Sequence, residues 1–259
     1  MNKSSMKIIK KTILLFIIVS LLGIITFSSI VNLYEKRKLI ASFILDKDNQ
    51  YSVTEEQDIY WSKEILNGGY ILHFRHAERD KWIDVQMYDS LESDLHQNGN
   101  DKSRFAEYDY FKNATCLNER GKIQAKAIGE HLKNIGLPIG PVVSSVSCRA
   151  RQTAELAFGG FSSQHKILVH GGPYLEDSKT RIKLLTKFYQ DLKMEIGKNT
   201  IVSSHGNVIN CEMFINDKCP KNVDLEEGGF FILSKSEVGL RFEHEFHYFK
   251  NFIKNFYIR

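Results

Sequence analysis

The chain has 259 residues, 42% of them hydrophobic and 25% charged, which allows a sizeable core and excludes a low-complexity protein. Its formal charge of +4 comes from the first 38 residues, where seven Lys and Arg residues stand against one Glu. That segment carries a net +6, so the remainder sums to −2, and nothing in this balance favours a nucleic-acid-binding surface.

A basic tail, residues 1–11, precedes an uncharged apolar run at 12–31. Twenty helical residues span roughly 30 Å, the thickness of a bilayer core. The run is longer than the apolar region of a secretory signal, and no clear small-x-small cleavage site follows it. We therefore predict a transmembrane signal anchor, with a cleaved signal as the alternative. Four lysines before the span against three basic residues after it favour an extracytoplasmic body by one charge.

Beyond a linker at 32–52, patterns typical of strands and helices alternate to the end of the chain, so we assign residues 53–259 to one domain. The predicted strands are 69–74, 141–145, 166–170, 200–204, 229–233 and 240–246. The predicted helices are 54–66, 118–135, 149–158, 180–196, one beginning near 207, and the tail 247–259. This order predicts an α/β fold, a three-layer α/β/α sandwich with a mostly parallel sheet, preceded by the transmembrane helix.

Three of these features leave alternatives open. The polar segment 80–115 is either a lid over a site or a surface insertion. The tail 247–259 is either a closing helix packed on the core or a helix lying on a membrane surface. Helical spacing also predicts two apolar faces. They comprise Ile123, Ala127, Ile128 and Leu132 on the first helix and Ile182, Leu185, Tyr189, Leu192 and Ile196 on the second.

The four cysteines, Cys116, Cys148, Cys211 and Cys219, lack the paired spacing of a zinc site. In an exported domain they can form up to two disulfides, whereas in a cytosolic protein they remain free thiols. Four cysteines allow three pairings. The short separation of Cys211 and Cys219 slightly favours that pair.

Basic residues follow three of the predicted strands. Strand 69–74 leads into Arg75-His76, the second strand is followed by Arg149, and strand 200–204 leads into His205. Because parallel strands end at one edge of a sheet, we expect these side chains to converge. Guanidinium forks bind phosphate oxygens and stay charged. A histidine with one ring nitrogen held can attack phosphorus through the other, and a second histidine can stabilise the transferring group.

The motifs around these residues resemble those of the histidine phosphatase superfamily, the phosphoglycerate-mutase-like fold. Residues 75–78, Arg-His-Ala-Glu, are similar to the family's R-H-G-E, and residues 117–125 to its L-T-E-x-G-x-x-Q-A. Residues 144–154 are similar to its S-S-x-x-x-R-A-x-Q-T-A, and His205-Gly206 to its late H-G. The resemblance covers residues 67–246.

This resemblance implies that His76 is the phosphorylated nucleophile and that Arg75, Arg149 and His205 complete a phosphate pocket without metal or cofactor. It also implies a three-layer sandwich. Two residues depart from the pattern. Ala77 replaces a glycine, and Arg79 produces the R-H-x-x-R pattern of the acid phosphatase branch, where that arginine also touches phosphate. The late H-D of that branch is absent here.

Many family members place a glutamate after the third strand, which makes Glu176 the predicted general acid. A carboxyl group there can protonate a leaving oxygen if burial raises its pKa. Asp177 and Glu78 are the alternatives, and a solvated carboxylate near the start of the next helix is the non-catalytic interpretation of Glu176.

The leading hypothesis is a membrane-anchored, metal-independent phosphomonoesterase that works through a phosphohistidine at His76. A mutase-like phosphotransferase and a non-catalytic phosphate-binding module are the alternatives. Expected partners are a phosphorylated small molecule or envelope phosphoester, and the membrane through residues 12–31. Substrate identity and oligomeric state cannot be read from the sequence.

Overall fold

A computed structural model describes residues 54–80, 115–169, 177–220 and 225–257. The chain divides into two units, and the second, Gln57–Arg259, is the one presented below. The predicted membrane span at 12–31, the linker at 32–52 and nearly all of the polar segment 80–115 lie outside the described residues. Within the described part of the chain, no helix is both long and apolar enough to cross a bilayer.

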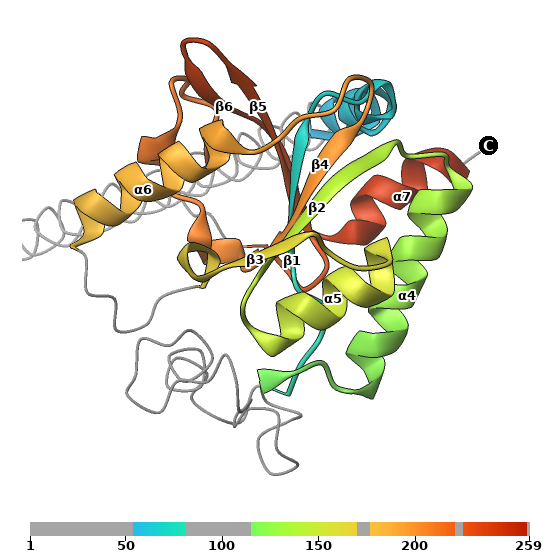
Figure 1. Cartoon of the computed structure of the whole chain (residues 1–259). Helices are drawn as coiled ribbons and strands as arrows, with labels where there is room; N and C mark the ends of the chain where they lie inside the picture. Colours follow the sequence, from blue (N-terminus) through green and yellow to red (C-terminus); the bar gives the residue numbers. More distant parts are fainter. Residues whose placement is uncertain (1–53, 81–114, 170–176, 221–224, 258–259) are drawn as a thin grey trace, which may run out of the picture. The chain divides into compact units, whose positions relative to one another are not determined.

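Six strands form one mixed sheet in the order β3-β2-β4-β1-β5-β6 (Figure 1). They are β1 Ile71–Arg75, β2 Ile139–Ser145, β3 Ser163–His165, β4 Asn199–Ser204, β5 Phe230–Ser236 and β6 Gly239–Phe246. Strands β1 to β4 are parallel to one another, whereas β5 pairs antiparallel with β1 and β6 antiparallel with β5. The predicted α/β class and mostly parallel sheet are therefore confirmed.

Helices cover both faces of this sheet, which makes three layers (Figure 1). One face packs against α4 Glu119–Asn134, α5 Cys148–Phe158, α7 Phe249–Tyr257 and the helical residues 57–64. The other face packs against α6 Ser178–Asp191. Single turns of 3-10 helix join these elements, namely η1 Ile65–Asn67, η3 Lys166–Leu168, η4 Gly206–Val208 and η5 Cys211–Met213.

Strand β1 is apolar because both of its faces are covered. Leu72 and Phe74 enter the core beneath α4, α5 and α7, whereas Ile71 enters the core beneath α6. Complete burial of Phe74 stabilises the fold by about 2 kcal/mol. Gly68 and Gly69, both with positive φ, let the chain turn from η1 into the strand. The strand therefore places Arg75 at the carboxyl edge of the sheet.

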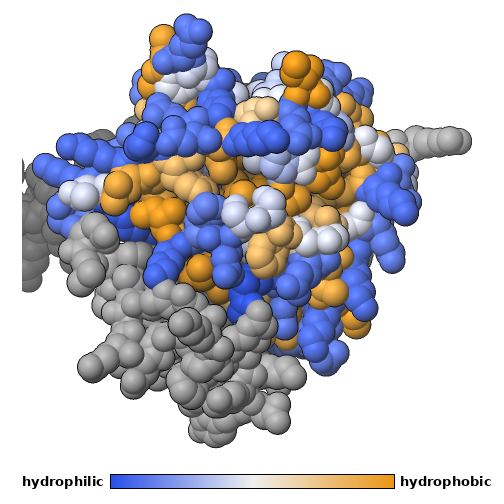
Figure 2. Space-filling view, in the orientation of Figure 1, coloured by the Kyte–Doolittle hydropathy of each residue, from blue (hydrophilic) through white to orange (hydrophobic). Residues whose placement is uncertain are grey.

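Two residues predicted to lie on apolar faces are exposed. Ile123 on α4 is 69% exposed, because Gly121 and Ala125 face inward in its place. A Cβ added to Gly121 would lie 1.9 Å from the carbonyl oxygen of Glu78, so the glycine permits this rotation of the helix. Ile196 is fully exposed, since α6 ends at Asp191 before reaching it. Figure 2 shows hydrophobic and hydrophilic residues interspersed on the face in view, and exposed apolar residues are normal on a folded protein.

Two predicted elements are also placed differently. The strand expected at 166–170 lies at β3, and its apolar residues form η3, whose Leu168 enters the core from a turn. The helix expected near 207 is reduced to η4 and η5. The tail helix is confirmed as α7, and its Phe252 is buried against the sheet, which favours the closing-helix interpretation.

Candidate active site

The carboxyl ends of β1, β2 and β4 lie level with one another. Arg75 is paired in register with Ser204, and Ser144 with Ser203. The residues that follow each strand therefore start from the same edge of the sheet. This edge brings together His76, Arg149 and His205, as the sequence predicts.

His76 is buried and continues the line of β1, with its main-chain nitrogen 2.9 Å from the carbonyl oxygen of Ser204. Its Nδ1 lies 2.7 Å from the carbonyl oxygen of Ala77. A carbonyl only accepts, so Nδ1 carries the hydrogen and Nε2 carries the lone pair. Among residues 54–80, 115–169, 177–220 and 225–257, no side chain or main-chain group hydrogen-bonds Nε2.

The electrostatic surroundings keep the His76 ring neutral. Burial lowers its pKa well below the ordinary value, and the positive charges of Arg149, Arg75 and Arg79 lower it further. The hydrogen bond to Ala77 acts in the opposite direction and raises the pKa, but the lowering effects prevail. A neutral imidazole with an open nitrogen, surrounded by three guanidinium groups, is suited to attack an anionic phosphoryl group.

His205 lies beside His76, with ring centroids 5.2 Å apart in an edge-to-face arrangement. Its Nε2 is 3.2 Å from the Ser147 hydroxyl and 3.5 Å from that of Ser145. Its Nδ1 is 3.5 Å from Nη2 of Arg149. Gly206 lets the chain leave this point, because a Cβ there would lie 2.9 Å from the main-chain nitrogen of Leu225.

Arg149 is completely buried in the first turn of α5. Its Nη1 donates to the carbonyl oxygen of Thr115, 3.2 Å away. The neighbours of these two residues in the chain, Cys148 and Cys116, form a disulfide. The disulfide therefore ties together the two segments that this hydrogen bond connects. The guanidinium is therefore held at the amino terminus of α5, where the helix dipole also favours an anion.

Arg75 and Arg79 complete the basic surroundings. Nη1 of Arg75 donates to the carbonyl oxygen of Leu225. Nη1 of Arg79 donates to the carbonyl oxygen of Asp80 at 2.9 Å. Both lie near enough to His76 to lower its pKa. The three predicted phosphate-binding arginines thus surround the same histidine.

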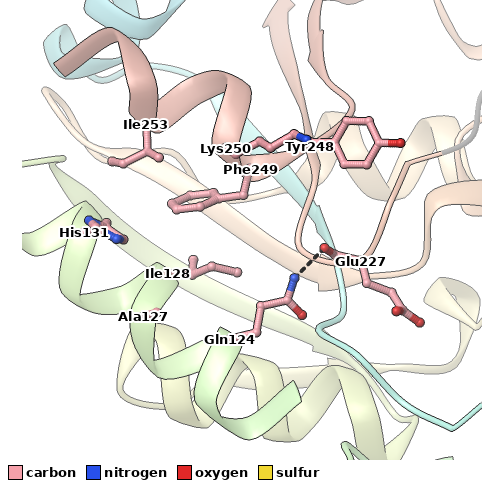
Figure 3. A pocket seen from close by; sticks show the side chains of 9 residues that line it. All are labelled: Gln124, Ala127, Ile128, His131, Glu227, Tyr248, Phe249, Lys250 and Ile253. Carbon is pink, nitrogen blue, oxygen red and sulfur yellow. Dashed lines mark hydrogen bonds between the residues drawn. The ribbon is translucent and has the colours of Figure 1, made fainter. Parts of the chain in front are cut away.

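The loop after His76 is held from two sides. The main-chain nitrogen of Ala77 donates to Thr153 Oγ1 at 2.9 Å, and that of Glu78 donates to Gln124 Oε1 at 2.9 Å. Gln124 also donates to the carbonyl oxygen of Glu227 at 2.7 Å (Figure 3). The methyl group of Ala77, at the position of the family's glycine, packs against Leu117 and Ala125.

The three carboxylates proposed as general acid have different outcomes. Glu176 lies outside the described residues. Asp177 caps α6 by accepting from Lys179 and Thr180, and the hydrogen bonds from Thr180 lower its pKa. Glu78 forms an ion pair with Arg120 and accepts from Asn118 at 3.3 Å. Both described carboxylates are bound by the protein, and their placement favours structural roles.

Sequence reasoning did not assign roles to several residues that support the site. Ser145 and Ser147 flank His205, and Thr153 and Gln124 hold the loop after His76. The serines at the end of β2 and just after it, Ser144, Ser145 and Ser147, were the sequence feature that could have indicated these contacts. In the described ranges, no group of three His, Cys, Asp or Glu side chains is placed to hold a metal ion.

Both disulfides are present, Cys116–Cys148 and Cys211–Cys219, and the favoured short pair is confirmed. They lie in different surroundings. Cys116 and Cys148 are buried beside Arg149, whereas Cys211 and Cys219 are partly buried around η5. The first pair therefore supports the site directly.

Residues 71–170 match the family model described as the histidine phosphatase superfamily, branch 1. No curated protein matches the chain. Among solved structures, the protein histidine phosphatase SixA complexed with tungstate shares 14% identity, with a TM-score of 0.44 over 68% of this chain and 95% of that one. Phosphoglycerate mutase from Bacillus anthracis str. Sterne shares 16% identity, with a TM-score of 0.47 over 73% of this chain and 98% of that one.

Proposed function

We propose that this chain, whose residues 71–170 match the model of the histidine phosphatase superfamily, branch 1, is a metal-independent phosphomonoesterase with a phosphohistidine intermediate at His76. The observation that carries the proposal is the His76 ring. Its Nδ1 is held by the Ala77 carbonyl, its Nε2 carries the lone pair, and its pKa is lowered by burial and by arginines. These are the requirements for a nucleophile that works near neutral pH.

In the first step, Nε2 of His76 attacks phosphorus and forms a P–N bond while the bond from phosphorus to the ester oxygen breaks. The departing oxygen takes a proton from a general acid, for which Glu176 remains our proposal. Arg75, Arg79 and Arg149 neutralise the phosphoryl oxygens, and His205 donates to one of them. These groups are already positioned, so little reorganisation is needed as charge shifts.

In the second step, water attacks phosphorus, the P–N bond breaks, and phosphate leaves as the His76 lone pair is restored. The carboxylate formed in the first step accepts the proton from water. The arginines and His205 act on the same oxygens in both steps. The protein therefore needs one acid–base group and one nucleophile for a complete cycle.

The decisive experiment is replacement of His76 with Ala, with hydrolysis of p-nitrophenyl phosphate as the readout. We expect turnover to fall at least about a thousandfold, because the covalent route is lost. The matched control is His131→Ala, which removes a histidine of α4 outside the site and should leave turnover within twofold. Acid-labile phosphate on the wild-type protein, absent from His76→Ala, would support the intermediate directly.

Other outcomes would favour the alternatives. Transfer of the phosphoryl group between substrates without net hydrolysis would indicate a mutase-like phosphotransferase. Phosphate binding by a correctly folded wild-type protein without any turnover would indicate a non-catalytic module. Equal turnover in His76→Ala and the wild type would contradict the proposal itself.

We further propose that residues 12–31 anchor the protein in a membrane, with domain 53–259 on the extracytoplasmic side. The two disulfides support an oxidising compartment. A phosphorylated small molecule or envelope phosphoester is the substrate class that this location favours. Sedimentation with membranes after a high-salt wash, and protease accessibility in intact cells, measure both points. Release by salt or full protection from external protease would contradict them.

A further inference from the structure

His73 is a buried histidine that the proposed mechanism does not use. It lies in the middle of β1 on the face covered by α6, and none of its surface is exposed. Its ring stacks on Phe231 with centroids 5.8 Å apart. A polar ring in an apolar core is costly unless its nitrogens are satisfied, and an aliphatic residue would fill the space without that cost. Its hydrogen bonds therefore indicate what it does.

Both ring nitrogens of His73 are hydrogen-bonded within the core. Nε2 lies 2.9 Å from the main-chain carbonyl oxygen of His205, and Nδ1 lies 2.6 Å from the hydroxyl of Tyr189. The carbonyl only accepts, so Nε2 carries the hydrogen, and Nδ1 accepts from the tyrosine. Tyr189 is fully buried on α6, and burial raises its pKa, so its hydroxyl remains a donor.

The carbonyl that His73 binds lies just beyond the end of β4. The β1–β4 pairing ends at Arg75 and Ser204, so this carbonyl belongs to the turn that follows the strand. This carbonyl also accepts a hydrogen bond from the main-chain nitrogen of Val208, at 3.3 Å. His73 and Val208 together orient the peptide plane from which the His205 side chain projects toward His76.

We propose that His73 is a positioning residue that holds His205 against the phosphoryl group, with Tyr189 selecting the ring tautomer that donates to the His205 carbonyl. The chain Tyr189–His73–His205 connects α6 through the sheet layer to the catalytic edge. This inference rests on the proposed function and extends it, because it assigns a role to a residue that touches neither substrate nor reacting atoms.

The variants separate positioning from packing. His73→Leu leaves the buried Tyr189 hydroxyl without an acceptor, so the main variant is His73→Leu/Tyr189→Phe, which removes both polar groups. His73→Gln supplies an amide donor for the His205 carbonyl and serves as the rescue. Ile71→Val, two residues earlier on the same face of β1, is the control for a core change without a hydrogen bond.

With p-nitrophenyl phosphate, we expect the double variant to fold and to lose about tenfold in kcat, with KM within twofold. His205 acts on charge in the transition state, so its displacement lowers kcat and spares substrate binding. His73→Gln should recover kcat to within threefold of the wild type, and Ile71→Val should match the wild type. In a His205→Ala background, adding the double variant should cause no further loss.

Orthovanadate affinity, measured by calorimetry, is the readout that does not require turnover. We expect about tenfold weaker binding in the double variant, because transition-state analogues respond to the same groups. A wild-type protein that binds orthovanadate without hydrolysing phosphate esters would contradict the proposed function. In that case the orthovanadate affinities of the wild type and the double variant would still test the role of His73. A folded double variant with kcat and orthovanadate affinity within twofold of the wild type would overturn the inference. The inference would also be overturned if the double variant lowered kcat in the His205→Ala background by the same factor as in the wild type.

Discussion

His73 and His76 belong to the same strand and its extension, are both buried, and both have lowered pKa values, yet they serve different ends. The ring nitrogens of His73 are both bound by the protein, to Tyr189 and to the His205 carbonyl. Only Nδ1 of His76 is bound in this way within the described part of the chain. The difference teaches that a lowered pKa is not enough to nominate a nucleophile, and our proposal for His76 rests in addition on its second ring nitrogen and the guanidinium groups nearby.

The sharpest way to break this comparison is to make the same substitution at both positions. His76→Gln should lower kcat at least about a thousandfold, because an amide cannot form the phosphohistidine. His73→Gln should stay within threefold of the wild type, because the amide can still donate to the His205 carbonyl. Steady-state hydrolysis of p-nitrophenyl phosphate measures both. Similar losses of kcat in the two variants would contradict this distinction and would show that the effect of each substitution follows from the burial of the histidine alone.

Arg149→Lys sharpens the role of the guanidinium groups near His76. Lysine keeps the positive charge but lacks the planar fork that binds two oxygens and reaches Thr115. We expect kcat/KM to fall about a hundredfold, comparable to the loss of one transition-state donor. Arg120→Lys, on the exposed ion pair with Glu78, is the control and should remain within twofold. A loss below fivefold at Arg149 would argue against bidentate binding.

The two disulfides extend the comparison from side chains to loops. Cys116–Cys148 closes a separation of 32 residues and Cys211–Cys219 one of 8. Loop-closure entropy predicts losses of about 4 and about 2.5 kcal/mol, respectively, on replacing each pair with serine. Only the first should also lower kcat/KM, by about tenfold, since it holds the segment around Arg149. Denaturant unfolding and steady-state kinetics measure these effects, and equal kinetic losses would remove the distinction.

Acid should reveal His73 through stability. Burial lowers the pKa of His73 to about 4 from an ordinary value of 6.5. Between these values the unfolded chain binds more protons than the folded one, so stability falls as pH decreases from 6.5 toward 4. The His73 contribution is roughly 3 kcal/mol at the acid end. His73→Gln should therefore flatten this part of the curve in denaturant unfolding at several pH values. An unchanged slope would contradict it.

The smallest expected effects concern the carboxylates already bound by the protein. Asp177→Ala removes the cap of α6 and should lower the thermal midpoint slightly, with kcat within threefold of the wild type. Glu78→Gln should also remain within threefold, because Glu78 serves Arg120 and Asn118. Glu176→Gln is the informative contrast, with an expected loss of at least about a hundredfold if it is the acid. A large loss at Asp177 or Glu78 would move the acid to that residue.

The sequence by itself determined the α/β class, the candidate site residues and the strands that bring them together. Arg75-His76, Arg149 and His205 follow predicted parallel strands, and parallel strands end at one edge, so local patterns sufficed to predict their convergence. The same reasoning predicted Ile123 and Ile196 to be apolar-face residues, which is wrong. Helical periodicity does not record that Gly121 must face the Glu78 carbonyl or that α6 ends at Asp191.

Only the tertiary structure decided which groups are open and which are bound. The Cys116–Cys148 disulfide, the serines around His205 and the hydrogen bonds of His73 join residues distant in sequence. Such contacts depend on how the layers pack, and the pattern of one segment contains no information about its partner on another. The sequence therefore singled out His76 as the candidate nucleophile by its neighbours. The fold distinguished it from the buried His73, because among the described residues only one of its ring nitrogens is hydrogen-bonded.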